Sequence, residues 1–199
     1  MIKSSIILLC CMAVGCVSAK VSEPSACDSK SMSWEIPNLP PQPAGAQSSL
    51  NGQSYTIPPT STTQSFDLSS TLSKVMDIAS NVHVGINELT LDNSNAQFDW
   101  VDSVSVTMTS PPLASMLLAD YTVTNRGESI DLLPSLVATP DQVLTYFQNG
   151  PVTLTVTLGN MTGTVIDESS LVMLHKLNGK VTAGLDVCIS ISADFNKSL

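Results

Sequence analysis

Residues 181–193 read Val-Thr-Ala-Gly-Leu-Asp-Val-Cys-Ile-Ser-Ile-Ser-Ala, with an apolar side chain at every second position. Successive side chains of a β-strand point to opposite faces, so this alternation buries one face and leaves the other polar. An α-helix would spread the same apolar residues around its whole circumference. The stretch therefore predicts one long, half-buried antiparallel strand, with Cys188 on its polar face.

Two other stretches extend the β prediction. Residues 152–158 alternate Val or Leu with Thr, which predicts a second clean strand. Residues 82–91 change phase, because their apolar side chains occupy even positions before Asn87-Glu88 and odd positions after it. A one-residue slip of this kind is what a β-bulge produces, so we expect a bulge near Asn87-Glu88.

Two short helices are predicted. Leu72, Val75 and Ala79 recur at the spacing of one helical face, which indicates a helix over about residues 70–80. The sequence Thr139-Pro140-Asp141-Gln142 offers a hydroxyl cap, a proline at the first helical position and a glutamine three residues after the cap. We expect that second helix to run to about Asn149.

Residues 170–177 fit either a buried strand or a helix. We favour the strand, because Asn178-Gly179 is the preferred pair for a two-residue β-hairpin. In that hairpin, Met173 and His175 would share the polar face with Cys188.

These patterns predict a mainly β fold: an antiparallel β-sandwich, immunoglobulin-like or related, with one or two short helices. Charged residues are sparse at 13% and aromatic residues at 5%, which suits a β-rich protein with a neutral hydroxyl surface. Residues 51–199 are expected to form a single β-sandwich domain. Residues 20–50 carry repeated prolines among small polar residues, which predicts a Pro-rich tether or extended arm.

The chain starts with a short positive end and an apolar run too short to span a bilayer as a helix, which predicts a secretory signal peptide. Two cleavage sites fit. Val17-Ser18-Ala19 suits an ordinary signal peptidase and gives a signal of residues 1–19. Ala13-Val14-Gly15-Cys16 resembles a bacterial lipobox and gives a signal of residues 1–15, with a lipid on Cys16. We expect an exported bacterial lipoprotein on an envelope membrane; a secreted or periplasmic soluble protein is the alternative.

Either cleavage leaves Cys27 and Cys188 as the cysteines that can pair in an oxidising compartment. We therefore expect a Cys27–Cys188 disulfide bond. A zinc site is not favoured, because neither cysteine has a second cysteine or a histidine at ligand spacing.

Other chemistry is weakly marked. The net charge of −9 would repel phosphate backbones, so no nucleic-acid partner is expected. His83 and His175 fall in predicted strands with no ligand or carboxylate at a recognisable spacing. The sequence contains no nucleophile elbow, phosphate loop or dinucleotide-binding glycine pattern. We expect no enzymatic activity, no catalytic residue and no cofactor.

One loop is rich in oxygen ligands. Asp92, Asn93, Asn95 and Asp99 make a weak calcium candidate, because Ca²⁺ takes about six to eight oxygen ligands. Their spacing lacks the glycine and the terminal Glu of an EF-hand loop, so a solvated turn is the favoured interpretation and no metal is expected.

The leading function hypothesis is a non-catalytic exported protein, lipid-anchored through Cys16, with a binding or structural role at the cell envelope or surface. Its partner would be an unknown protein or glycan. The alternative is a carrier of an apolar small molecule or lipid, held between the sheets or under residues 113–118. A polymer-acting hydrolase that uses a carboxylate pair from residues 88–102 ranks last.

Overall fold

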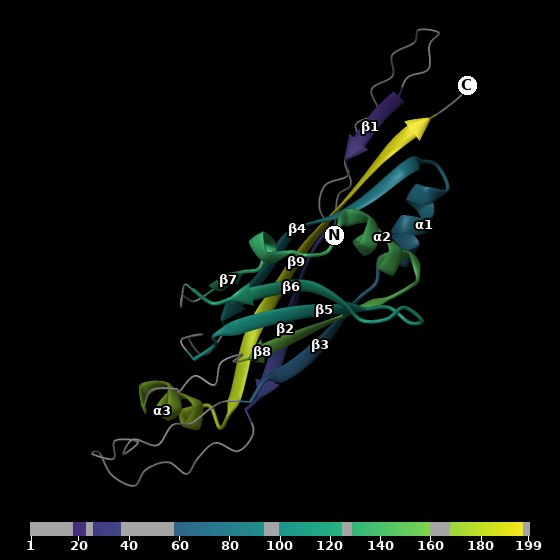
Figure 1. The fold of residues 1–199 in the computed structure, drawn as a ribbon. Coiled ribbons are helices and arrows are strands. Elements are labelled where there is room, and N and C mark those ends of the chain that lie inside the picture. Colours follow the sequence, from purple (N-terminus) through teal and green to yellow (C-terminus); the bar gives the residue numbers. More distant parts are fainter. Residues whose placement is uncertain are drawn as a thin grey trace.

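Two antiparallel β-sheets pack face to face as a sandwich (Figure 1). The structure is a computed structural model and describes residues 18–22, 26–36, 58–93, 100–124, 129–159 and 168–196. The predicted mainly β sandwich with short helices is confirmed.

Sheet A is organised around β9 (Lys180–Asn196), the long strand predicted from residues 181–193. β2 (Ala26–Glu35) and β1 (Ser18–Ser22) pair with successive parts of one edge of β9. β4 (Ser80–Asn93) pairs with the other edge, and β7 (Ser129–Asp131) lies beyond β4. Sheet B has the order β3 (Thr60–Phe66), β8 (Val152–Gly159), β5 (Ser103–Thr109) and β6 (Met116–Thr122).

The strand pairs are nested. β2 pairs with β9, β3 with β8, β4 with β7 and β5 with β6, like the two arms of one long hairpin. This hairpin folds over on itself where β9 meets β4 and β8 meets β5. Such wrapping of eight strands into two sheets is the jelly-roll arrangement. The connectivity therefore specifies a jelly roll within the predicted class, in place of the immunoglobulin strand order.

The alternation in β9 fixes the core as predicted. Its odd-numbered residues from Val181 to Ala193 are all buried, together with the apolar residues of β8. Trp34 of β2 lies in the same core, and its indole Nε1–H donates a hydrogen bond of 3.1 Å to the carbonyl oxygen of Val156 on β8. This buried bond ties sheet A to sheet B.

The predicted bulge in β4 is confirmed. Ile86 pairs with Ile189, whereas Glu88 pairs with Cys188, so β4 holds one extra residue at Asn87. The extra residue moves the apolar positions of β4 from the even to the odd phase. Glu88 thereby lies on the outer face of sheet A.

Both predicted helices are present. α1 (Ser69–Met76) and α2 (Pro140–Gln148) lie close together near one end of β4, and a short 3₁₀ helix, η1 (Leu133–Ser135), precedes α2 (Figure 1). The capping box of α2 is confirmed: Thr139 N–H donates to Gln142 Oε1 at 2.8 Å, and Gln142 N–H donates to Thr139 Oγ1 at 3.3 Å. None of the described helices has the length and apolarity needed to span a bilayer.

The hairpin predicted at Asn178-Gly179 is wrong. Residues 168–176 form a helix, α3 (Glu168–Lys176), with Leu171 and Leu174 buried. Asn178 and Gly179 have φ values of 52° and 70°, and Gly179 N–H donates to the Leu174 carbonyl at 2.8 Å to close the helix. Left-handed backbone at Asn-Gly serves a helix terminus as well as a hairpin turn. Met173 and His175 therefore lie on α3, not on a strand beside Cys188.

Residues 26–35, which lie in the predicted Pro-rich tether or extended arm, form β2. Met32 and Trp34 on this strand are each only 1% exposed. The segment therefore belongs to sheet A and contributes to the core, because its alternate apolar residues point between the sheets.

Candidate functional site

The outer face of sheet B is covered with hydroxyl groups. In β3, β8 and β5 the residues that face away from the core are serines and threonines, apart from Gly159 at the end of β8, and they line up in rows across the strands. Two cross-strand hydroxyl contacts link β3 to β8, Ser61 Oγ to Thr157 Oγ1 at 2.8 Å and Ser65 Oγ to Thr153 Oγ1 at 3.2 Å. This array, the hydroxyl face, comprises Ser61, Thr63, Ser65, Ser105, Thr107, Thr109, Thr153, Thr155 and Thr157.

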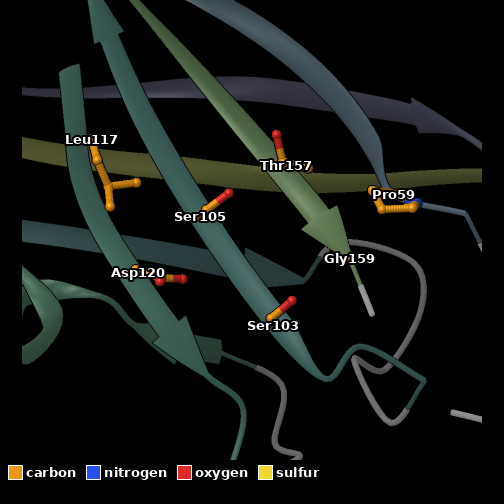
Figure 2. Close-up of a pocket in the computed structure, with 7 residues that line it drawn as sticks. All are labelled: Pro59, Ser103, Ser105, Leu117, Asp120, Thr157 and Gly159. Carbon is orange, nitrogen blue, oxygen red and sulfur yellow. The ribbon is translucent and has the colours of Figure 1, made fainter. Parts of the chain in front are cut away.

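A hollow of about 340 Å³ lies at one end of the hydroxyl face. Figure 2 shows Thr157, Ser105 and Asp120 on the neighbouring strands β8, β5 and β6. Ser105 pairs with both Thr157 and Asp120, so the three residues form one row across the sheet. The lining residues are Pro59, Ser103, Ser105, Leu117, Asp120, Thr157 and Gly159.

Two backbone features make room for the hollow. Gly159 pairs with Ser103, and because glycine has no side chain, the space beside Ser103 stays open. A Cβ atom at Gly159 would lie 3.5 Å from Pro59 Cβ and from Ser103 Oγ, which is ordinary contact. A register shift between β5 and β6 then places Leu117 opposite Thr107, and Leu117 is 42% exposed. The hollow therefore combines an apolar patch with hydroxyls.

The chemistry of the hollow suits binding. The Asp120 carboxylate accepts hydrogen bonds, and the hydroxyls of Ser103, Ser105 and Thr157 both donate and accept them. Leu117 offers apolar contact to the face of a ring. Among the described residues that line the hollow, Asp120 is the single ionisable group. The carboxylate pair predicted for a hydrolase, from residues 88–102, does not line the hollow and stays a prediction.

The outer face of sheet A differs in chemistry. Cys27 pairs with Cys188 across β2 and β9, and Glu88 pairs with Cys188 from β4. The predicted disulfide bond joins Cys27 and Cys188. Cys188 is 7% exposed although it lies on the outer face, whereas Cys27 and Glu88 are exposed. Glu88 Oε2 lies 2.9 Å from Cys188 Sγ, a close contact and not a hydrogen bond, because a disulfide sulfur has no proton to donate.

A second acidic feature lies nearby on the same face. The pKa of Asp92 is raised above its usual value, first by partial burial of the carboxyl and then by the hydrogen bond and charge of Asp186. Asp92 lies on β4 and Asp186 on β9, so neither the spacing nor the local sequence connects them. The charge of Asp186 thus adds to burial in disfavouring the ionised form of Asp92.

The calcium candidate is only partly within the described residues. Asp92 pairs with Gly184 and Asn93 with Ala183, so they occupy successive positions of β4. Asn95 and Asp99 lie outside the described residues, so the weak calcium candidate is not tested. Cys16, the predicted lipidation site, also lies outside the described residues.

The two histidines belong neither to the hollow on sheet B nor to the cluster of Cys27, Cys188 and Glu88 on sheet A. His83, on β4, is exposed and its Nδ1 lies 3.4 Å from a carboxylate oxygen of Asp141 at the start of α2. His175 lies on α3, at the other end of β9.

Comparison with known proteins adds little. Neither a family model nor a curated protein matches this sequence. Among solved structures, a chain from desmodium yellow mottle tymovirus is similar at 12% identity over 98% of this chain and 99% of that chain, with a TM-score of 0.24. A similarity this low supports no statement about fold or function.

Proposed function

We propose that this chain is a non-catalytic, exported binding protein that holds a neutral glycan in the hollow on sheet B. The observation that carries the proposal is the row of Thr157, Ser105 and Asp120 beside Leu117. A sugar ring presents hydroxyls that pair with such acceptors and donors, and C–H groups that pack on an apolar side chain. The acidic net charge of −9 disfavours anionic polymers as the ligand.

Export to an envelope or surface is part of the same proposal. The Cys27–Cys188 disulfide is typical of proteins that mature in an oxidising compartment. Strand β1 favours cleavage before Cys16 and a lipid anchor there. Cleavage after Ala19 would remove the first two residues of this five-residue strand, whereas cleavage before Cys16 keeps it whole. The intact mass of the mature protein from its own host distinguishes the two, because a lipid on Cys16 adds mass that a cut after Ala19 does not.

Binding is tested by filling the hollow. Gly159→Val puts a β-branched side chain, which suits a strand, into the space between Pro59 and Ser103. We expect it to abolish binding on an array of neutral oligosaccharides. Asp120→Asn should weaken binding by about tenfold or more, because a hydrogen bond to a charged group contributes about 1.5–3 kcal/mol.

Thr155→Val is the matched control. It changes the hydroxyl face outside the hollow and should leave binding unchanged. Neutral-glycan binding that survives in the Gly159→Val protein, or no binding by the unaltered protein to any neutral oligosaccharide, contradicts the proposal.

A second candidate function is a structural subunit of an assembly, to which the nested strand pairing is equally suited. Jelly rolls form viral capsid subunits as well as lectin domains, and a fold alone does not choose between them. Mass photometry and electron microscopy of the mature protein test this candidate. Closed shells or regular oligomers support a structural subunit, and a monomer at all concentrations contradicts it.

A further inference from the structure

We infer that Cys27, Cys188 and Glu88 form a Zn²⁺ site when the disulfide is reduced, so that this junction of sheet A has a disulfide form and a metal form. Sequence spacing disfavoured zinc because each cysteine lacks a local ligand. The sheet supplies the third ligand from another strand.

The first observation is convergence. Cys27 Sγ, Cys188 Sγ and a carboxylate oxygen of Glu88 all lie within 4.8 Å of one another. With Zn–S bonds of about 2.3 Å and Zn–O bonds of about 2.0–2.2 Å, the ligand atoms of a tetrahedral site lie roughly 3.5–3.8 Å apart. Breaking the S–S bond lets the sulfur atoms separate to that spacing by side-chain rotation. Three protein ligands and one water complete a four-coordinate zinc site.

The second observation is the bulge in β4. If β4 continued its alternation without a bulge, position 88 would keep the even phase and point into the core. The bulge instead brings Glu88 directly opposite Cys188, where its Oε2 is 2.9 Å from Sγ. Bulges often re-aim one side chain toward a functional group. An anionic carboxylate held against sulfur gains little in the disulfide form, whereas a bound cation between them would make the contact favourable.

The surrounding charge is of the right sign. Asp186 precedes Cys188 by two residues on the same face of β9, and it lies beside Asp92 of β4. These carboxyl groups make the local potential negative and raise the local concentration of cations.

The chemistry balances with a thiol reductant. Two reductant thiols become one disulfide, and the Cys27–Cys188 bond takes up the two electrons and two protons to give two cysteine thiols. Zn²⁺ binding then releases those two protons and leaves two thiolates on the metal. Cys27 is exposed, so it is the sulfur that a reductant thiolate reaches first.

Cobalt provides the test, because Co²⁺ bound to thiolates absorbs visible and near-ultraviolet light. The mature chain, reduced with a water-soluble phosphine under argon, is titrated with CoCl₂ and then with ZnCl₂. We expect one Co²⁺ per chain with thiolate charge-transfer absorption, displaced by Zn²⁺. The oxidised chain should show neither signal.

Variants assign the ligands. Cys27→Ser should lose the signal, and Glu88→Gln should weaken Zn²⁺ binding at least tenfold, since loss of even an outer partner of a metal ligand costs about 10–100-fold. Asp186→Asn, which removes a neighbouring carboxyl group outside the cluster, should change the affinity far less. Circular dichroism of each reduced chain reports folding with and without metal, so a chain that refolds on adding Zn²⁺ also supports the site. No cobalt absorption in the reduced chain, or unaltered affinity in Glu88→Gln, would overturn the inference.

Discussion

The outer faces of sheets A and B obey the same rule of alternation but carry different chemistry. Sheet B presents serines and threonines in rows, with Asp120 in its hollow. Sheet A presents a disulfide bond with Glu88 against it, and the carboxyl pair of Asp92 and Asp186. The difference shows that the inward residues specify the sandwich, while the outward residues are free to make one face rich in hydroxyl groups and the other rich in carboxyl groups. A substitution in the core should therefore affect the stability of both sheets, whereas one on an outer face should affect that sheet alone.

The largest effect is expected where the sheets meet. Trp34→Ala removes a side chain that is 1% exposed and the hydrogen bond to Val156 that links the sheets. We expect it to lower the free energy of unfolding by about 3–5 kcal/mol, the cost of a large cavity. Urea unfolding monitored by far-ultraviolet circular dichroism measures it. A loss below about 1 kcal/mol would show that the two faces do not depend on a shared core.

The next effect belongs to sheet A alone. Replacing Cys27 and Cys188 together by serine opens a loop with a sequence separation of 161 residues. The chain-entropy argument gives about 5 kcal/mol for such a loop, and measured losses are typically about 2–5 kcal/mol. Urea unfolding of the double variant without reductant should show this loss. If the disulfide-bonded protein and the double serine variant had equal urea unfolding midpoints, the disulfide would not stabilise sheet A.

The carboxyl pair of Asp92 and Asp186 should lower the stability of the folded protein, by less than the disulfide raises it. The pKa of Asp92 is raised in the folded chain, so the folded state holds this proton more tightly than the unfolded state and loses stability as pH rises through and above the usual value of 3.8. Asp92→Asn should therefore stabilise the protein at pH 7, by about 0.2–1 kcal/mol for a cross-strand like-charge pair. The gain should vanish in acid, below the usual pKa.

Thermal unfolding at neutral and acidic pH checks this sign. Asp28→Asn is the control on the same sheet, because Asp28 pairs with Lys30 at 2.8 Å and its neutralisation should give no stabilisation. A neutral-pH loss of stability in Asp92→Asn would contradict the repulsion.

The smallest effect is expected on sheet B. Thr155→Val replaces a central member of the hydroxyl face with a side chain of similar shape. Its free energy of unfolding should stay within about 0.5 kcal/mol of the original, as for most surface substitutions. Urea unfolding measures this directly. A loss above that range would mean that the outward side chains, not only the core, contribute to the stability of sheet B.

Local sequence predicted those elements whose pattern is itself local. The strands around residues 152–158 and 181–193, the bulge at Asn87 and the Thr139 capping box needed only a few neighbouring residues. β3 gave no such signal, because its inward positions are also polar: Thr60, Thr62 and Gln64 are half-buried. α3 was misassigned because a left-handed Asn-Gly pair ends a helix as readily as it turns a hairpin.

The candidate sites depend on register across strands, which sequence spacing does not reveal. Nothing local places Gly159 opposite Ser103, or Asp92 beside Asp186. Glu88 was the exception that sequence could have reached: once the bulge is accepted, the phase change turns it to the same side as Cys188. The local sequence does not show that β4 pairs with β9, because the two strands lie far apart in the chain.

The position of β9 in the chain has a consequence for biosynthesis. This strand pairs with β1, β2 and β4, which all lie far before it in the sequence. Sheet A therefore cannot close until residues 180–196 have been synthesised, and contacts of such long sequence separation form slowly. β1, β2 and β4 therefore remain without this partner strand during synthesis, and their unpaired backbone groups are exposed to pairing with other chains in that interval.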